Sequence, residues 1–145
     1  MTITTTDRTL PFLLAGFARA ALSLRMVAHT LVARHTDAVN FADVANVHGW
    51  ARTTRAIACE AYDVAQLHYA VERLHGATRA VDAQITLHHI GDARRIVREI
   101  LAACEDASDH YAASRSLDAQ NAVGRMLGQF EALNSAAARL AAAHA

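Results

Sequence analysis

The residues with the clearest capacity for chemistry are two histidines and a glutamate near the middle of the chain. His68, Glu72 and His75 follow one another at spacings of four and three residues, so on a helix they lie within about 60° of each other on one face. Imidazole nitrogens and a carboxylate at that spacing can bind zinc, nickel, copper or iron. The spacing therefore predicts a metal site on one face of a helix.

A further ligand is expected from the next helix. Facing positions in an antiparallel helical hairpin have a nearly constant index sum, so a turn at 76–78 places His88 or His89 about one turn from His68. His144 is a further candidate for the same end of the bundle. The alternative is structural: His68 and His75 end an apolar stripe, and Glu72 or water satisfies them.

Two cofactor alternatives use the same residues. A haem could be held between two of these histidines, or between Met26 and a histidine, although no haem motif is present. A carboxylate-bridged di-iron centre is disfavoured, because it needs glutamates from several helices and two E-x-x-H pairs. Here only Glu72 and His75 have that form, and the whole chain contains five glutamates.

The same index rule, applied to the other two turns, gathers a second histidine group at the opposite end. It predicts that His29, His48 and His110 lie close together, with Asp106 one turn before His110 and with His35 near the turn. The structural alternative is again that these are separate flank residues of amphipathic helices.

The segment Val27-Ala28-His29-Thr30-Leu31 resembles the phosphorylated-histidine helix of histidine-phosphotransfer domains, which are four-helix bundles of similar length. The resemblance covers about five residues and implies that His29 accepts a phosphoryl group from a response-regulator aspartate. The chain departs from the family at Val32 and Ala33, where lysine and glycine are usual. The Arg25 and His29 pair is also distantly similar to the Arg/His pair of dimeric helical RNases.

Four long helices are expected to position these residues. Alanine makes up about a quarter of the chain and Pro11 is the one proline, a composition that favours helix. We expect helices over about 10–35 and 41–75, a third that begins at Thr78 or Arg79 and ends at a break at 114–116, and a fourth that follows Ser116 as its N-cap, with 1–8 as a frayed leader. Asn40 with Asp43 resembles a capping box, Gly76 a C-cap, and Gly91 a soft point in the third helix.

Apolar positions recur at helical spacing on each segment. The second helix carries the stripe Val47, Trp50, Thr54, Ile57, Ala61, Val64, His68, Val71 and His75. The fourth helix carries the most regular seam, Ala119, Val123, Met126, Phe130, Leu133, Ala137 and Leu140. Such seams pack along near-parallel helices, so residues 1–145 are predicted to form one all-α domain, an antiparallel up-down-up-down four-helix bundle with short turns.

Composition excludes several classes of function. The net charge is zero, with fourteen basic and fourteen acidic residues, so no general nucleic-acid or acidic-membrane binding is expected. Cys59 and Cys104 lie far apart and indicate reduced thiols in a cytoplasmic protein. The apolar stretch 10–18 continues into a helical stripe and lacks a positive leader, and Arg19 and Arg25 are costly inside a bilayer, so neither secretion nor a membrane span is expected.

The function predicted from the sequence is a non-catalytic interaction or assembly module. Helices this long bury more surface than a thin bundle can cover, and two aromatic clusters suggest a leftover apolar face that a second copy covers. They are Leu127 with Phe130, and Trp50 with Tyr62 and Tyr69. The alternatives are the metal or haem bundle and a phosphotransfer module centred on His29.

Overall fold

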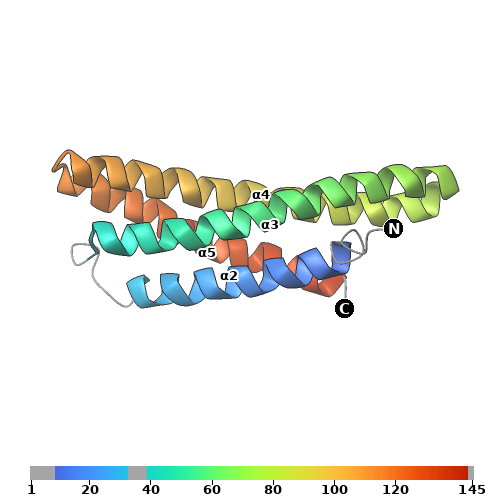
Figure 1. Ribbon diagram of the computed structural model, residues 1–145, viewed down its shortest axis with the longest axis horizontal. Coiled ribbons are helices and arrows are strands. Elements are labelled where there is room, and N and C mark those ends of the chain that lie inside the picture. Colours follow the sequence, from blue (N-terminus) through green and yellow to red (C-terminus); the bar gives the residue numbers. More distant parts are fainter. Residues whose placement is uncertain (1–8, 33–38, 144–145) are drawn as a thin grey trace, which may run out of the picture.

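The computed structural model describes residues 9–32 and 39–143 and consists of four helices (Figure 1). They are α2 (Leu10–Val32), α3 (Phe41–His75), α4 (Ala77–Ala112) and α5 (Ser116–Ala143). All regular structure in the described residues is helical, which confirms the all-α class. The predicted boundaries of the second and third helices and the predicted start of the fourth agree within about two residues. The expected continuation of the first helix to His35 lies outside the described residues.

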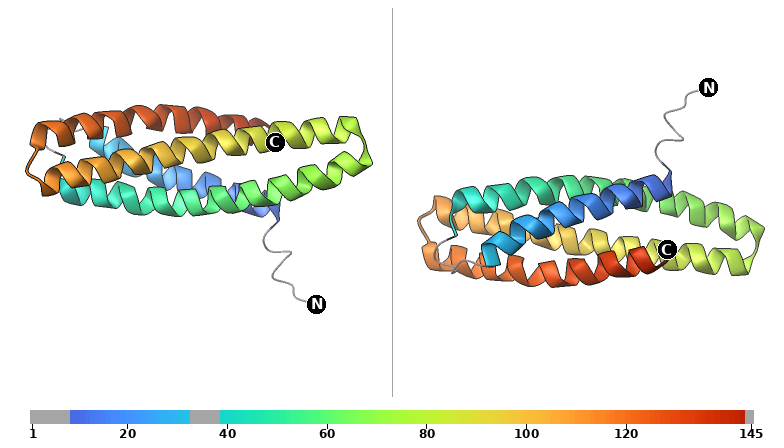
Figure 2. Two further views of the ribbon diagram at one scale, coloured as in Figure 1. Left: turned by 90° about the horizontal axis from the view of Figure 1, so that it is seen from above. Right: turned by 90° about the horizontal axis from the view of Figure 1, so that it is seen from below.

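Each helix packs beside its neighbours in the chain, and α2 also touches α5 (Figure 2). The closest pairs are α3 with α4 and α4 with α5, whereas α2 and α5 make few contacts. Consecutive helices run in alternate directions in both views, an arrangement compatible with the expected antiparallel bundle.

Local signals fix where α3 begins and ends. The Asn40 side chain accepts a hydrogen bond from the Asp43 backbone N–H (3.1 Å), and the Asp43 carboxylate accepts one from the Asn40 N–H (3.0 Å). This reciprocal pair is the predicted capping box. Gly76 has φ 130°, a conformation that disfavours any residue with a Cβ, and it alone separates α3 from α4.

The core of α3 is made of smaller residues than predicted. Its buried side is formed by Val44, Val47, Ala51, Thr54, Ala58, Ala61, Ala65 and Glu72. Val47, Thr54 and Ala61 belong to the predicted stripe, but Trp50 and Val71 are exposed. The predicted stripe lies to one side of the observed buried face, because large residues such as Trp50 and Val71 define the predicted stripe. Alanines form much of the observed buried face and let α3 approach α4 closely.

The seam of α5 is confirmed. Six of its seven predicted positions are buried, and Ala137 is partly buried against the core. On α2, Leu13, Phe17, Leu24 and Leu31 are buried, whereas Leu22 and Met26 are exposed.

Gly91 is not a soft point. The α4 helix runs through it unbroken, and a Cβ there would lie 3.3 Å from Cε2 of Tyr62. The missing side chain lets the Tyr62 ring lie close to α4, where the Arg94 guanidinium stacks over it at 3.9 Å from the ring centre. Tyr62 and the buried Phe130 are therefore parts of helix contacts, and not of the leftover apolar face that was expected.

The α3–α4 pair extends past the other two helices (Figures 1 and 2). Gly16 of α2 faces Ile57 of α3, and the Cys104 and Met126 sulfurs of α4 and α5 are 3.2 Å apart. Counting along the antiparallel helices from these two contacts places the first residue of α2 at about the same height along the bundle as Asp63 of α3. The same count places the last residue of α5 at about the height of Leu87 of α4. We call residues 66–86, which form the overhanging end, the hairpin tip; it is about 15 Å long at the standard helical rise.

Candidate functional site

A large open cavity lies where the hairpin tip extends past the first residue of α2. It has a volume of about 670 Å³ and an open mouth, and Leu10, the first residue of α2, forms one edge. The remaining lining comes from α3 and α4: His68, Glu72, Arg79, Asp82, Ala83, Ile85 and Thr86. We call this cavity the tip groove.

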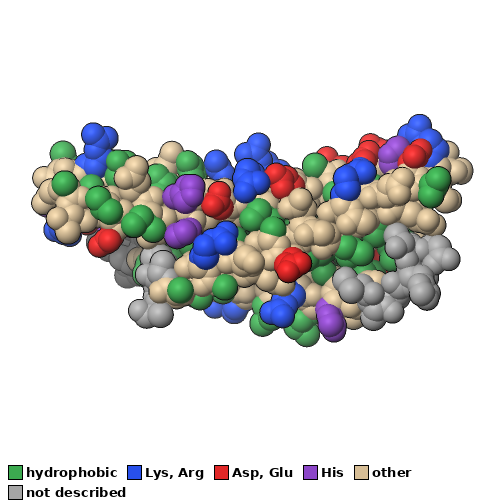
Figure 3. Space-filling model, turned by 180° about the vertical axis from the view of Figure 1, so that it is seen from behind, with side chains coloured by type: hydrophobic (Ala, Val, Ile, Leu, Met, Phe, Trp, Pro, Cys, Tyr) green, Lys and Arg blue, Asp and Glu red, His purple; other side chains and the backbone are tan. Residues whose placement is uncertain are grey.

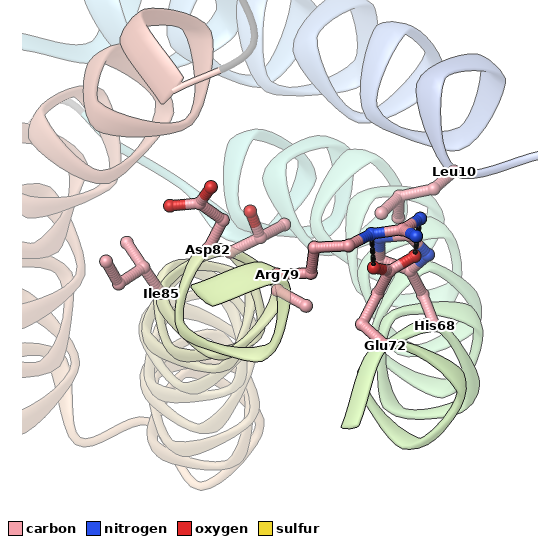
Figure 4. Close-up of a pocket in the computed structure, with 8 residues that line it drawn as sticks. Leu10, His68, Glu72, Arg79, Asp82 and Ile85 are labelled. Atoms are coloured by element: carbon pink, nitrogen blue, oxygen red, sulfur yellow. Dashed lines mark hydrogen bonds and ion pairs between the residues drawn. The ribbon is translucent and has the colours of Figure 1, made fainter. Parts of the chain in front are cut away.

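Glu72 and Arg79 form a two-point ion pair at the tip groove (Figure 4). Arg79 Nη2 donates to Glu72 Oε1 at 2.9 Å, and Nε lies 2.5 Å from Oε2. Glu72 continues the buried side of α3 seven residues after Ala65, and its side chain is only 10% exposed. A carboxylate in that position needs a partner, and Arg79, in the first turn of α4, supplies both donors.

The other polar residues of the groove are arranged around this pair. Figure 4 shows His68 beside it on α3, while Asp82 and Ile85 project from the side of α4 that turns toward α5. The groove therefore combines a neutralised ion pair, an imidazole and a carboxylate with aliphatic surface.

The five residues predicted to hold a metal do not converge. His68 and Glu72 line the same groove, but His75 does not line it. His88 is exposed and lies 3.5 Å from Asp92, whereas His89 is half-buried with an unpartnered Nδ1. Across residues 9–32 and 39–143, no three His, Cys, Asp or Glu side chains are grouped as metal ligands.

The second predicted histidine group is also divided. His48 Nε2 lies 3.7 Å from Glu105, and His110 Nε2 lies 3.3 Å from Asp106, which also pairs with Arg125 of α5. His29 is exposed in the last turn of α2 and, within the described part of the chain, forms no hydrogen bond or ion pair with either. His35 and His144 lie outside the described residues. The group therefore consists of local ion pairs and one exposed histidine.

Sequence reasoning missed the Glu72–Arg79 pair although a signal was present. The constant index sum of facing positions, which placed His88 or His89 about one turn from His68, also places Glu72 about one turn from Arg79 on the next helix. On α3 itself, the neighbours of Glu72 at helical spacing include His68 and His75, and these suggested a metal site instead. An arginine three residues after the turn glycine is a better partner for a nearly buried carboxylate than a neutral imidazole.

The Cys104 thiol stays protonated and unreactive in the folded protein at neutral pH. Burial raises the pKa of its thiol to about 12, with a smaller contribution from Glu105, and its Sγ contacts Met126 Sδ. Burial also raises the pKa of Tyr111, whose hydroxyl donates to the Val39 carbonyl at 2.8 Å. Because the thiolate is the reactive form, Cys104 is a structural residue and not a nucleophile.

The raised thiol pKa predicts a loss of stability at alkaline pH. The unfolded thiol ionises near pH 9.0 and the folded one near 12, so the stability is complete below pH 9 and is lost as the pH rises from 9 to 12. At pH 10 the loss from Cys104 should be about 1 kcal/mol. Urea unfolding at neutral pH and at pH 10 should show a smaller pH effect in Cys104→Ala than in the wild type. Equal pH effects in both proteins would contradict the assignment.

One helix of the described chain meets the length and composition expected of a membrane span. It is the segment Leu10–Leu31 of α2, in which 28% of the most apolar window is buried. Core helices and signal sequences have the same character, so this finding alone assigns no membrane role.

Comparisons with protein-family models, with curated proteins and with solved structures find no match to this chain.

Proposed function

We propose that the protein is a non-catalytic assembly module that forms a symmetric homodimer through the hairpin tip. The observation that carries this proposal is that α3 and α4 continue past α2 and α5, leaving the groove-side face of the tip without covering helices. Ile85, which lines the groove on the α5 side, is 47% exposed.

A second copy fits this face in shape. The tip is a layer two helices wide that lacks the two helices present elsewhere in the bundle. The tip of a second copy, related by a two-fold axis, supplies two helices of the same length, so the overlap becomes a four-helix unit. Each copy offers the same surface, as a closed dimer requires.

The charges of the tip also favour self-association. Residues 66–86 contain two carboxylates, Glu72 and Asp82, and two guanidinium groups, Arg73 and Arg79. The tip is therefore neutral, and Glu72 and Arg79 already satisfy each other. A second neutral tip meets no net repulsion, whereas a strongly charged partner gains nothing from this surface.

The metal and phosphotransfer alternatives have less support. Glu72 is engaged by Arg79, so a metal at His68 and Glu72 must displace a two-point ion pair. His29 is exposed, as a phosphoryl acceptor must be, but it lies in the last turn of described α2 and not at mid-helix.

The dimer is tested by changing the groove side of the tip. Light scattering of the wild type should give twice the chain mass of 15.6 kDa. Ile85→Ser should raise the dimer dissociation constant by about 30-fold, since the lost aliphatic contact of about 1 kcal/mol counts twice in a symmetric interface. Circular dichroism confirms that the variant keeps its helices.

The matched control is Leu67→Ser with Leu74→Ser. These leucines are more exposed, at 70% and 85%, but do not line the tip groove, so the control should remain dimeric. A wild type that is monomeric at high concentration contradicts the proposal. So does a dimer that the control variant disrupts while the Ile85 variant does not.

A further inference from the structure

The outer face of α2 is apolar and uncovered. Phe12, Leu22 and Met26 are between 49% and 64% exposed. Phe12, Arg19 and Met26 are seven residues apart, as are Ala15 and Leu22, so all five lie on one stripe along the side away from the core. From Phe12 to Met26 the stripe is about 21 Å long at the standard rise.

The net charge of the whole chain is zero, from which no binding to acidic membranes is expected, but this stripe carries only positive charge. The α2 helix contains Arg19, Arg25 and His29 and no acidic residue. Both arginines are exposed, and neither forms an ion pair within the described part of the chain. Figure 3 shows hydrophobic, arginine and histidine side chains next to one another along the lower edge of the molecule, where α2 lies.

An apolar groove opens beside the stripe. It lies between α2 and α5, has a volume of about 340 Å³, and is lined only by apolar residues: Pro11, Leu14, Ala15, Phe17, Ala18, Ala137, Leu140 and Ala141. Alanines on both helices are too short to fill the space between them, and α2 and α5 make few contacts. The groove adds apolar surface of a shape that can receive a hydrocarbon chain.

We propose that the outer face of α2 binds the surface of an anionic lipid membrane. A helix with exposed apolar residues and unpaired arginines can lie in the plane of a membrane interface, with its apolar side chains among the acyl chains and its arginines at lipid phosphates. This is surface binding, in which Arg19 and Arg25 stay at the headgroups and the helix does not span. The dimer proposed above uses the hairpin tip and leaves α2 free.

A second copy is a poor occupant of this face. Two α2 helices packed on each other bring four arginines together with no carboxylate from either helix, and like charges in contact oppose association. A flat array of lipid phosphates supplies the opposite charge along the whole stripe.

The test is sedimentation of the full chain with vesicles. The wild type should bind vesicles of mixed phosphatidylcholine and phosphatidylserine, bind pure phosphatidylcholine much less, and be released by salt, which screens the charges. Phe12→Ser/Leu22→Ser/Met26→Ser should lower the partition coefficient at least tenfold. Arg19→Gln/Arg25→Gln should lower it about 25-fold on anionic vesicles, from about fivefold for each arginine.

The matched control is Leu67→Ser/Leu74→Ser, which removes exposed leucines of α3 and should bind vesicles as the wild type does. Folded wild type that binds neither kind of vesicle overturns the proposal, and so does equal binding to neutral and anionic vesicles. An α2 variant that binds as strongly as the wild type also overturns it. In that case, capture of an acidic peptide by the wild type would assign the face to a protein.

Discussion

Replacing Leu24 with alanine should lower the free energy of unfolding by about 3–4 kcal/mol. Leu24 is fully buried on the core side of α2, and truncating such a leucine removes its transfer free energy and leaves a cavity that its neighbours fill only in part. The bundle is thin, and the loss is a large share of the stability of a domain of this size. Urea unfolding followed by circular dichroism gives the value.

Leu22→Ala is the matched control on the same helix. Leu22 is two residues away and about half exposed, so the same chemical change should alter the free energy of unfolding by less than about 0.5 kcal/mol. Equal losses in the two variants would show that α2 does not pack by the face described above. They would also remove the exposed stripe on which membrane binding rests.

Arg79→Ala should also destabilise the fold, by about 1–2 kcal/mol. It leaves the Glu72 carboxylate, which is 10% exposed, without its two donors. Breaking a fully buried pair costs about 3–5 kcal/mol. The Arg79 side chain is 61% exposed, so water screens the pair and reaches the carboxylate once the arginine is removed.

A second substitution separates the charge from the packing. Adding Glu72→Gln to Arg79→Ala removes the unpaired charge and should restore at least half of the lost stability. A double-mutant cycle on these two positions should give a coupling free energy near 1 kcal/mol. If Arg79→Ala unfolds at the same urea concentration as the wild type, the ion pair makes no net contribution.

Helix positions were the best-predicted part of this protein. The 41–75 helix was predicted to the residue, because the Asn40–Asp43 capping box and Gly76 are local signals that act through the backbone itself. The α5 seam was predicted nearly as well, since its large residues repeat every three or four positions and face one way.

Side-chain grouping was predicted less well. The index rule gave the right level for residues on facing helices, but level alone does not say on which flank a side chain lies. His88 lies beside Asp92 on an exposed flank of α4, and His110 beside Asp106, so neither joins the group proposed for it. A rotation of one residue on a helix moves a side chain by about 100°, enough to take it from the core to the surface.

The sequence alone determined that the chain forms four helices, where most of them end, and which face of α5 is buried, since capping, alanine content and apolar periodicity act over a few residues. Tertiary structure decided which residues of α3 enter the core, that Arg79 pairs with Glu72, and that the hairpin tip and the outer face of α2 stay uncovered in the described chain. These depend on the rotation, length and offset of whole helices, which are set by packing between residues far apart in the chain.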